Sequence, residues 1–211
     1  MIASARRVVP VDAVAVGMAA NIFAACNESE QALRAARSAI ALADEQPTMS
    51  NRFYAHMGLA YALMNSDPEA ALRAVDESLD AVVDSANFPP LVWTFIPRVV
   101  SHLRLGLVAD ACADLVTALP AAAHGGLRWG VFQLGSFLVP VLRHAGDERR
   151  AWAIYLAVRE VVHPAATRDL VELPAEQRPP ASGVPVLDDY DHLVQFVLEA
   201  VVVAADRLHV S

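Results

Sequence analysis

A repeat of about forty residues runs through this chain and limits what it can fold into. Its second helices share a small residue near their starts, at Ala32, Ala71, Ala111 and Ala151, with separations of 39, 40 and 40. Seven residues further on, the same register holds Ala39, Ser78, Ala118 and Val158. Residues seven apart lie on one helix face, where small side chains let the second helix of a hairpin pack closely against the first. The spacing predicts stacked antiparallel helical hairpins.

The remaining sequence also favours helix, because apolar residues recur at helical spacing and no stretch alternates as a half-buried strand would. Turn signals such as Asp67-Pro68, Gly106 and Gly146 separate the helical stretches. The predicted helices cover 12–26, 29–44, 50–65, 68–84, 91–105, 107–119, 129–145, 147–162 and 187–208. We expect an all-α fold of about four hairpins and a C-terminal capping helix. An ordinary alanine-rich bundle, whose alanines align by chance, is the alternative.

The first helix of the second unit resembles a known repeat. Its residues Met57, Gly58, Ala60 and Tyr61 are similar to the leucine-glycine-x-alanine-tyrosine stretch of the tetratricopeptide repeat. The first helices of the third and fourth units do not match this pattern, and the period here exceeds the ~34 residues usual for that family. The resemblance implies a tetratricopeptide-like α-solenoid.

A second resemblance begins at the run AWAIYLAVRE, Ala151–Glu160, and continues beyond a proline-rich gap with a helix near Tyr190. It is similar to the C-terminal end of the helical-repeat region in large actinobacterial signalling ATPases of the LuxR and cyclase types. The likeness implies a sensing or docking module. All sixteen positive side chains are arginines, so a phosphate-binding P-loop lysine is missing, and no helix-turn-helix unit is recognisable. We therefore do not expect the ATPase or DNA-binding parts of such regulators.

The chain divides into three stretches within one structural domain. Residues 1–163 form the predicted repeat stack, 164–186 a connector rich in proline, and 187–211 the capping helix. The connector is long for a compact domain. We favour an ordered surface loop drawn across the last hairpin, with a lid or a flexible linker as the alternatives.

Composition excludes several function classes. A net charge of −8 and a pI near 5.3 argue against a nucleic-acid surface, which needs clustered positive charge. The apolar run from Val8 to Cys26 is interrupted by Pro10, Asp12 and Asn21, so we expect neither a signal peptide nor a membrane span. The two cysteines lack the spacing of a zinc or redox site, which suits a reducing, cytoplasmic compartment. We expect no cofactor, no metal and no catalytic residues.

Two polar clusters deserve an interpretation. Asp188, Asp189, Asp191 and His192 could suggest a metal site, but acidic residues at a helix start cap free backbone amides, and we favour that role. Glu160 and His163 have the Glu-x-x-His spacing of di-iron bundles, yet no second copy accompanies them. We assign neither cluster a ligand.

The first helices of a repeat stack line its concave face, which is the usual site for a peptide. The repeat register places six polar or aromatic residues on or near that face: Asn21, Arg52, Trp93, Arg104, Gln133 and Arg143. Arginines there could clamp a carboxylate through paired hydrogen bonds, and Trp93 could anchor an apolar side chain. The plainer interpretation, in which Trp93 belongs to the core and the arginines are merely solvated, is the one that we favour for the individual residues.

We therefore expect a non-enzymatic protein-protein interaction or regulatory scaffold module that binds a protein, a peptide or a second copy of itself. A small-molecule sensor is the runner-up, with its ligand held between the proline-rich connector and the helices kinked at Pro97 and Pro140. Enzymatic activity is the least favoured hypothesis, since the sequence contains no recognisable nucleophile elbow or metal cluster.

Overall fold

Ten α-helices make up the regular structure of the residues that the computed structural model describes, which are 12–82, 92–159, 167–173, 187 and 189–210. They are α1 (Ala13–Ala25), α2 (Ser29–Glu45), α3 (Met49–Leu63), α4 (Pro68–Asp80), α5 (Val92–Arg104), α6 (Val108–His124), α7 (Arg128–His144), α8 (Glu148–Val158), α9 (Arg168–Val171) and α10 (Tyr190–Arg207). No strand occurs within these ranges, so the all-α prediction is confirmed.

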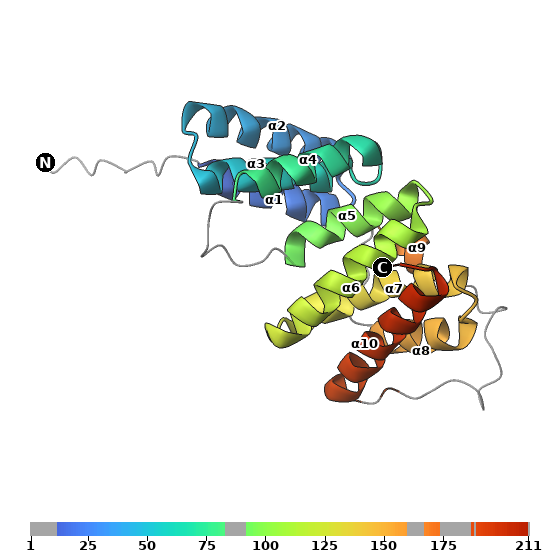
Figure 1. The fold of residues 1–211 in the computed structure, drawn as a ribbon. Helices are drawn as coiled ribbons and strands as arrows, with labels where there is room; N and C mark the ends of the chain where they lie inside the picture. Colours follow the sequence, from blue (N-terminus) through green and yellow to red (C-terminus); the bar gives the residue numbers. More distant parts are fainter. Residues whose placement is uncertain (1–11, 83–91, 160–166, 174–186, 188, 211) are drawn as a thin grey trace, which may run out of the picture.

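The helices pair as the repeat predicts, and Figure 1 shows the hairpins α1–α2, α3–α4, α5–α6 and α7–α8 stacked in chain order. The small residues that define the repeat lie on the second helix of each hairpin. Ala32, Ala71, Ala111 and Ala151 have no exposed surface. Ala39, Ser78, Ala118 and Val158 are buried as well. The forty-residue spacing therefore marks the interface between the helices of each hairpin.

Three of these hairpins end their first helix with the same turn. Gly106 and Gly146 have φ angles of 73° and 74°, in the left-handed region that glycine adopts without strain. The amide of Leu107 donates to the carbonyl of His102 at 2.9 Å, the six-residue bond that closes such a helix end. Asn27 takes the equivalent place in the first unit with φ 62°. Asparagine tolerates this conformation better than most residues, which explains how the first unit manages without a glycine.

Most predicted helix boundaries agree with the structure to within a few residues. The side chains of Asp67 and Asp189 accept hydrogen bonds from the backbone amides of Ala70 and His192, so both are N-caps, a role that was expected for Asp189. The α6 prediction ended at residue 119, whereas the helix continues through Pro120 to His124. Proline removes only one helical hydrogen bond. Burial of Ala122 on the far side of Pro120 helps α6 to continue.

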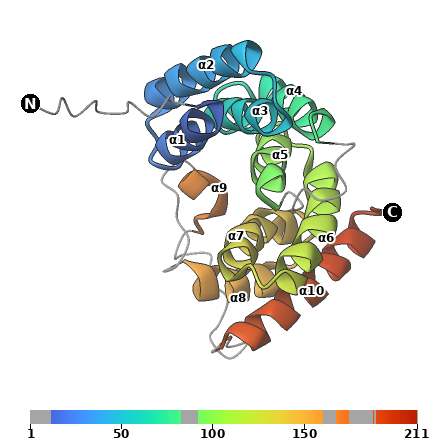
Figure 2. The ribbon, with the colours of Figure 1, turned by 90° about the vertical axis from the view of Figure 1, so that its left-hand side faces the viewer.

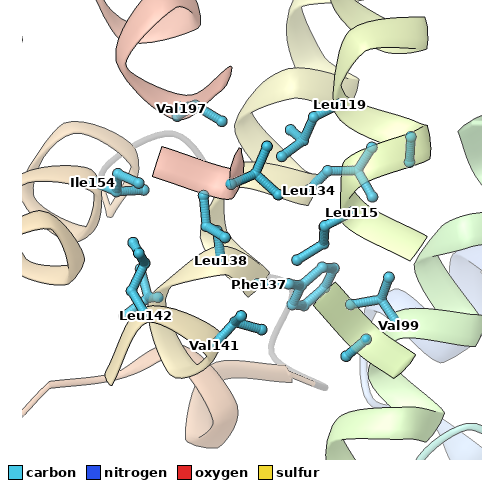
Figure 3. Packing of buried hydrophobic residues seen from close by; sticks show 14 of the residues in the cluster. Val99, Leu115, Leu119, Leu134, Phe137, Leu138, Val141, Leu142, Ile154 and Val197 are labelled. Atoms are coloured by element: carbon cyan, nitrogen blue, oxygen red, sulfur yellow. The ribbon is translucent and has the colours of Figure 1, made fainter. Parts of the chain in front are cut away.

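The core changes character along the stack. Between α1, α2 and α3 it consists largely of alanines, and α1 meets α3 at Gly17 and Gly58. A Cβ on Gly58 would lie only 2.9 Å from the carbonyl oxygen of Gly17, so the two backbones touch where no larger side chain fits. Farther along, α5, α6, α7, α8 and α10 bury leucines, valines and Phe137 in one continuous cluster, shown in Figure 3.

The last two helices lie on opposite sides of α7, as Figures 1 and 2 show. The long helix α10 packs against α6, α7 and α8, so the predicted capping helix covers the third hairpin as well as the fourth. At its start the ring of Tyr190 lies 5.8 Å from that of Phe132 in α7. Near its end Arg207 donates to the carbonyl of Ala145, just beyond α7. Helix α10 therefore runs parallel to α7. None of the described helices has the length and hydropathy needed to cross a bilayer.

Candidate functional site

Charge is distributed unequally between the two helices of each hairpin. The first helices, α1, α3, α5 and α7, contain no acidic residue. Their ionisable basic residues are Arg52, His56, Arg98, His102, Arg104, Arg128, Arg143 and His144. The second helices carry Glu30, Asp44, Glu45, Glu69, Asp76, Glu77, Asp80, Asp110, Asp114 and Glu148. The first helices thus carry no carboxylate of their own, although carboxylates of the second helices pair with four of their basic residues, His56, Arg98, His102 and Arg143.

The surface of the first helices holds a short segment of the chain itself, residues 167–173, which we call the α9 segment. Figure 2 shows α9 on the inner side of the curve formed by α1, α5 and α7. The segment packs against α7 and buries the side chains of Thr167, Val171 and Leu173. The connector was predicted to cross the last hairpin, and its described part lies on the first-helix surface. Residues 164–166 and 174–186 of that prediction lie outside the described residues, as do Glu160, His163 and Asp188.

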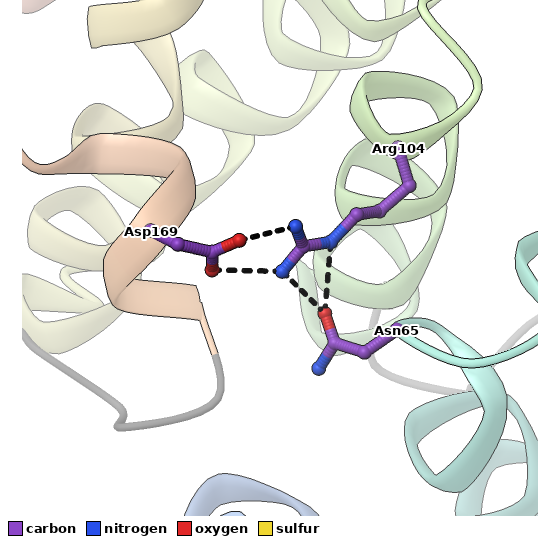
Figure 4. Close-up of polar contacts among 3 residues, drawn as sticks. All are labelled: Asn65, Arg104 and Asp169. Carbon is purple, nitrogen blue, oxygen red and sulfur yellow. Dashed lines mark hydrogen bonds and ion pairs between the residues drawn. The ribbon is translucent and has the colours of Figure 1, made fainter.

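Arg104 of α5 joins the α9 segment to the stack (Figure 4). Its two terminal nitrogens lie 2.5 and 2.8 Å from the carboxylate oxygens of Asp169, a paired geometry that matches the planar guanidinium to the carboxylate. Its Nε and one terminal nitrogen also donate to Oδ1 of Asn65, at 3.1 and 3.0 Å. The guanidinium of Arg104 holds the pKa of the Asp169 carboxyl below its usual value. Arg104 therefore clamps a carboxylate of its own chain, whereas the clamp considered from the sequence was for the carboxylate of a partner.

Trp93 is not a core residue, because its side chain is 43 % exposed. Its ring centroid lies 5.1 Å from that of Trp129, which is 48 % exposed, with the ring planes tilted by 39°. The pair forms an apolar ledge at the N-terminal ends of α5 and α7, which we call the tryptophan ledge. Trp129 was not among the residues that the sequence predicted for this surface. It is the second residue of its helix, as Trp93 is of α5, and this equivalence could have revealed it.

A proline inside α5 explains how this ledge is tied to the second hairpin. Pro97 has no backbone N–H, so the carbonyl of Trp93, four residues earlier, loses its helical partner. The hydroxyl of Tyr61 in α3 donates to that carbonyl at 3.1 Å. Burial raises the pKa of Tyr61 above its usual range, which keeps the hydroxyl protonated as a donor. The interior proline thus leaves the carbonyl of Trp93 free to accept a hydrogen bond from Tyr61 of the neighbouring hairpin.

Gln133 lies one helical turn beyond Trp129 on the same face of α7. It was predicted on the concave surface, but only 4 % of it is exposed. Its side-chain Oε1 has no hydrogen-bond partner among the described residues. An unpaired buried amide oxygen is unfavourable, and such groups are uncommon in folded proteins. Gln133 therefore offers an unused acceptor beneath the surface of α7.

The other predicted residues do not gather into one site. Arg143 of α7 pairs with Glu148 at 3.3 Å, across the turn to α8. Arg52 of α3 is exposed, and Asn21 of α1 is half-buried. The structure thus places Trp93 and Arg104 on α5, with Gln133 and Arg143 on α7. Asp169 and Asn65, which complete the clamp, could not be found from the repeat register because they lie outside the four first helices.

A second arginine of α5, Arg98, pairs with Asp114 of α6 and not with the α9 segment. Nε of Arg98 lies 3.2 Å from the buried carboxylate of Asp114 in α6, and Nδ1 of His102 lies 2.9 Å from its other oxygen. A buried carboxylate needs such partners, so this cluster fixes the α5–α6 hairpin. Arg104, two residues past His102, is the arginine of α5 that serves the α9 segment.

Hollows elsewhere on the described surface lie along α10. One of about 790 Å³ lies between α8 and α10 and includes Arg150, Val194 and Leu198 in its lining. Another of about 520 Å³ lies where α10 begins, beside Arg128 and Tyr190. Neither is lined by the interior prolines of α5 and α7. No group of three potential metal ligands occurs within the described residues.

Fold and surface together define an all-α stack of helical hairpins whose first helices form a basic surface occupied by the chain's own acidic segment. Comparison of the chain with known protein families, curated proteins and solved structures gave no match. What the arrangement can do chemically follows from its own residues. The guanidinium of Arg104 pairs with a carboxylate, and the tryptophan ledge offers exposed apolar surface.

Proposed function

We propose that this protein is a non-enzymatic binding module that holds a segment of a partner protein against its first helices. The observation that carries the proposal is the α9 segment, which lies on this surface with Asp169 clamped by Arg104. The chain itself thus illustrates the kind of segment that the surface accepts. The segment combines two buried apolar residues, Val171 and Leu173, with one paired carboxylate, Asp169. Protein interfaces commonly combine a buried apolar centre with polar contacts in this way.

The tryptophan ledge supports the same function. Exposed tryptophans are among the residues that contribute most to protein interfaces, because a large apolar ring is combined with one hydrogen-bond donor. Trp93 and Trp129 lie next to each other on adjacent first helices, and both remain exposed. A partner segment can bury them at small entropic cost, since the two rings already contact each other.

In a cellular setting the proposal fits a regulatory scaffold in the cytoplasm. The resemblance to the repeat regions of actinobacterial signalling regulators makes a docking or sensing role within such a system our preferred context. A second copy of the chain is another partner to consider, because the acidic second helices of one copy complement the basic first helices of another. Sedimentation at several concentrations separates self-association from binding of a different protein.

A peptide selection tests the proposal. Peptides selected from a random display library against the full chain should bind the wild type and lose affinity for Trp129→Ala by about tenfold, as expected for a buried aromatic anchor. Val202→Ala is the matched control, because Val202 is exposed on the far helix α10. The proposal fails if the selection yields no binder, or if the binders respond equally to the two substitutions.

A further inference from the structure

We infer that the α9 segment is an internal competitor, and that the external ligand is an acidic segment which replaces it on Arg104. The inference rests on the proposed function and names the ligand class and its regulation. Asp169 pairs with Arg104, while Val171 and Leu173 of the same segment are buried. The ligand class is therefore a segment with an acidic residue followed, two and four positions later, by apolar residues.

The electrostatics of the surface explain why the ligand is acidic. Arg104 is already held in position by Asn65, so its planar donors face outward in a fixed geometry. Helices α1, α3, α5 and α7 contain no acidic residue. The carboxylates of Glu77, Asp114 and Glu148, which reach these helices from their neighbours, pair with basic residues other than Arg104. A segment without a carboxylate at this position would leave the Arg104 guanidinium unpaired and would lose the charge-assisted hydrogen bonds.

The internal segment is held by one ion pair and three buried side chains. The side chain of Asp169 is 63 % exposed, so water and dissolved ions can compete for its pairing with Arg104. Helix α9 has four residues, too few to be stable without its contacts. Thr167, Val171 and Leu173 supply the remaining attachment through burial.

An external ligand has contacts that the α9 segment leaves unused. Trp93 and Arg104 lie on the same helix, about 16 Å apart along its axis at ~1.5 Å per residue. An extended peptide covers that distance with roughly five residues. A ligand that places its acidic residue on Arg104 can therefore also cover the tryptophan ledge, which stays exposed beside the α9 segment. These added contacts favour the external ligand in the competition.

The competition is measured with a fluorescein-labelled peptide of residues 167–173, TRDLVEL, added to the full chain. Asp169→Asn removes the internal carboxylate with little change in shape and should empty the clamp. A tethered segment acts at an effective concentration of about 1 mM, so a peptide with a Kd of about 100 µM for the emptied surface should bind the wild type roughly tenfold more weakly. Fluorescence anisotropy gives both constants.

Reversing the charges on both partners separates a loss of binding from a loss of folding. Arg104→Glu should lose the peptide but bind a version that carries arginine in place of its aspartate, because the clamp is then reversed. Arg37→Gln removes an exposed arginine from α2 and is the matched control that should leave binding unchanged. Binding to Asp169→Asn should also weaken with added salt, as a pairing of exposed charges requires.

Three results would overturn the inference: equal affinity of wild type and Asp169→Asn, indifference to the aspartate of the peptide, or no exchange of preference in Arg104→Glu. These failures differ from failure of the proposed function. Display-selected peptides that depend on Trp129 but bind the two chains equally would leave the binding module intact and remove the competitor. The opposite outcome is also possible: the 167–173 peptide binds through Arg104, but the display selection yields no peptide that depends on Trp129. That outcome would remove the proposed function and confine the α9 segment to a structural role.

Discussion

The hydrogen bond between Tyr61 and the carbonyl of Trp93 offers a test of why this stack tolerates a proline inside α5. Pro97 cannot donate to that carbonyl, and the Tyr61 hydroxyl replaces the missing helical donor at 3.1 Å. Tyr61→Phe removes only the hydroxyl and leaves the carbonyl without a protein partner. In a Pro97→Ala background the restored N–H of residue 97 can bind the carbonyl, so the hydroxyl should matter less.

The magnitude follows from the surroundings of the acceptor. An unpaired buried carbonyl costs ~1–3 kcal/mol, and we take the lower end because Trp93 is partly exposed. We expect Tyr61→Phe to lower the free energy of unfolding by about 1 kcal/mol, and Tm by about 2–4 °C in a chain of this size. In the Pro97→Ala background the same change should cost less than about 0.5 kcal/mol.

Urea denaturation followed by far-ultraviolet circular dichroism measures all four members of this double-mutant cycle. Pro97→Ala also removes packing made by the proline ring. This loss cancels in the cycle, because it is present in both proteins that carry Pro97→Ala. A cost of Tyr61→Phe that is the same in both backgrounds would refute the reasoning. It would mean that the hydroxyl does not substitute for the amide that proline lacks.

Three further predictions concern other parts of the molecule. Gly17→Ala places a Cβ 2.2 Å from a backbone oxygen of α3 and should cost about 1–3 kcal/mol in urea denaturation, whereas Gly135→Ala meets only an ordinary 3.6 Å contact and should be neutral or stabilising; equal losses would contradict this. Because folding lowers the pKa of Asp169, its contribution is complete above the ordinary aspartate pKa of ~3.9 and is lost as pH falls through the lowered value. Carbon NMR of that carboxyl should show a midpoint below ~3.9, and an ordinary midpoint would contradict the clamp. Burial raises the pKa of Cys112 to about 11 while Cys26 is exposed, so a thiol reagent at mildly alkaline pH should label Cys26 first, and equal rates would contradict the burial.

The hairpin architecture could be predicted from sequence because its signal is local. Ala71 and Ala111 recur at a fixed interval and pack within their own hairpins, so their burial follows from helix periodicity alone. Caps such as Asp67 are equally local, since the side chain binds an amide three residues ahead. The end of α6 was predicted too early, because the burial that carries the helix past Pro120 depends on neighbouring helices.

The candidate site was predictable only in part. The repeat register put Trp93 and Arg104 on the first helices, where the structure has them. A clamp by arginines of this face was only one hypothesis, and it concerned the carboxylate of a partner. The carboxylate in the structure comes from Asp169, sixty-five residues later in a stretch without helical repeat signals. Gln133 was assigned to the same surface as an accessible residue, and packing buried it instead. Neither fact is encoded in a local pattern.

The sequence by itself determined that this chain forms helical hairpins and that its first helices are basic, because periodicity and charge need only the order of residues along each helix. Only the tertiary structure decided where residues 167–173 of the connector lie and that Asp169 among them pairs with Arg104. The physical reason is distance along the chain. Contacts such as Arg104 with Asp169 or Tyr61 with Trp93 join segments whose meeting depends on how every intervening hairpin packs, and no short-range pattern records that outcome.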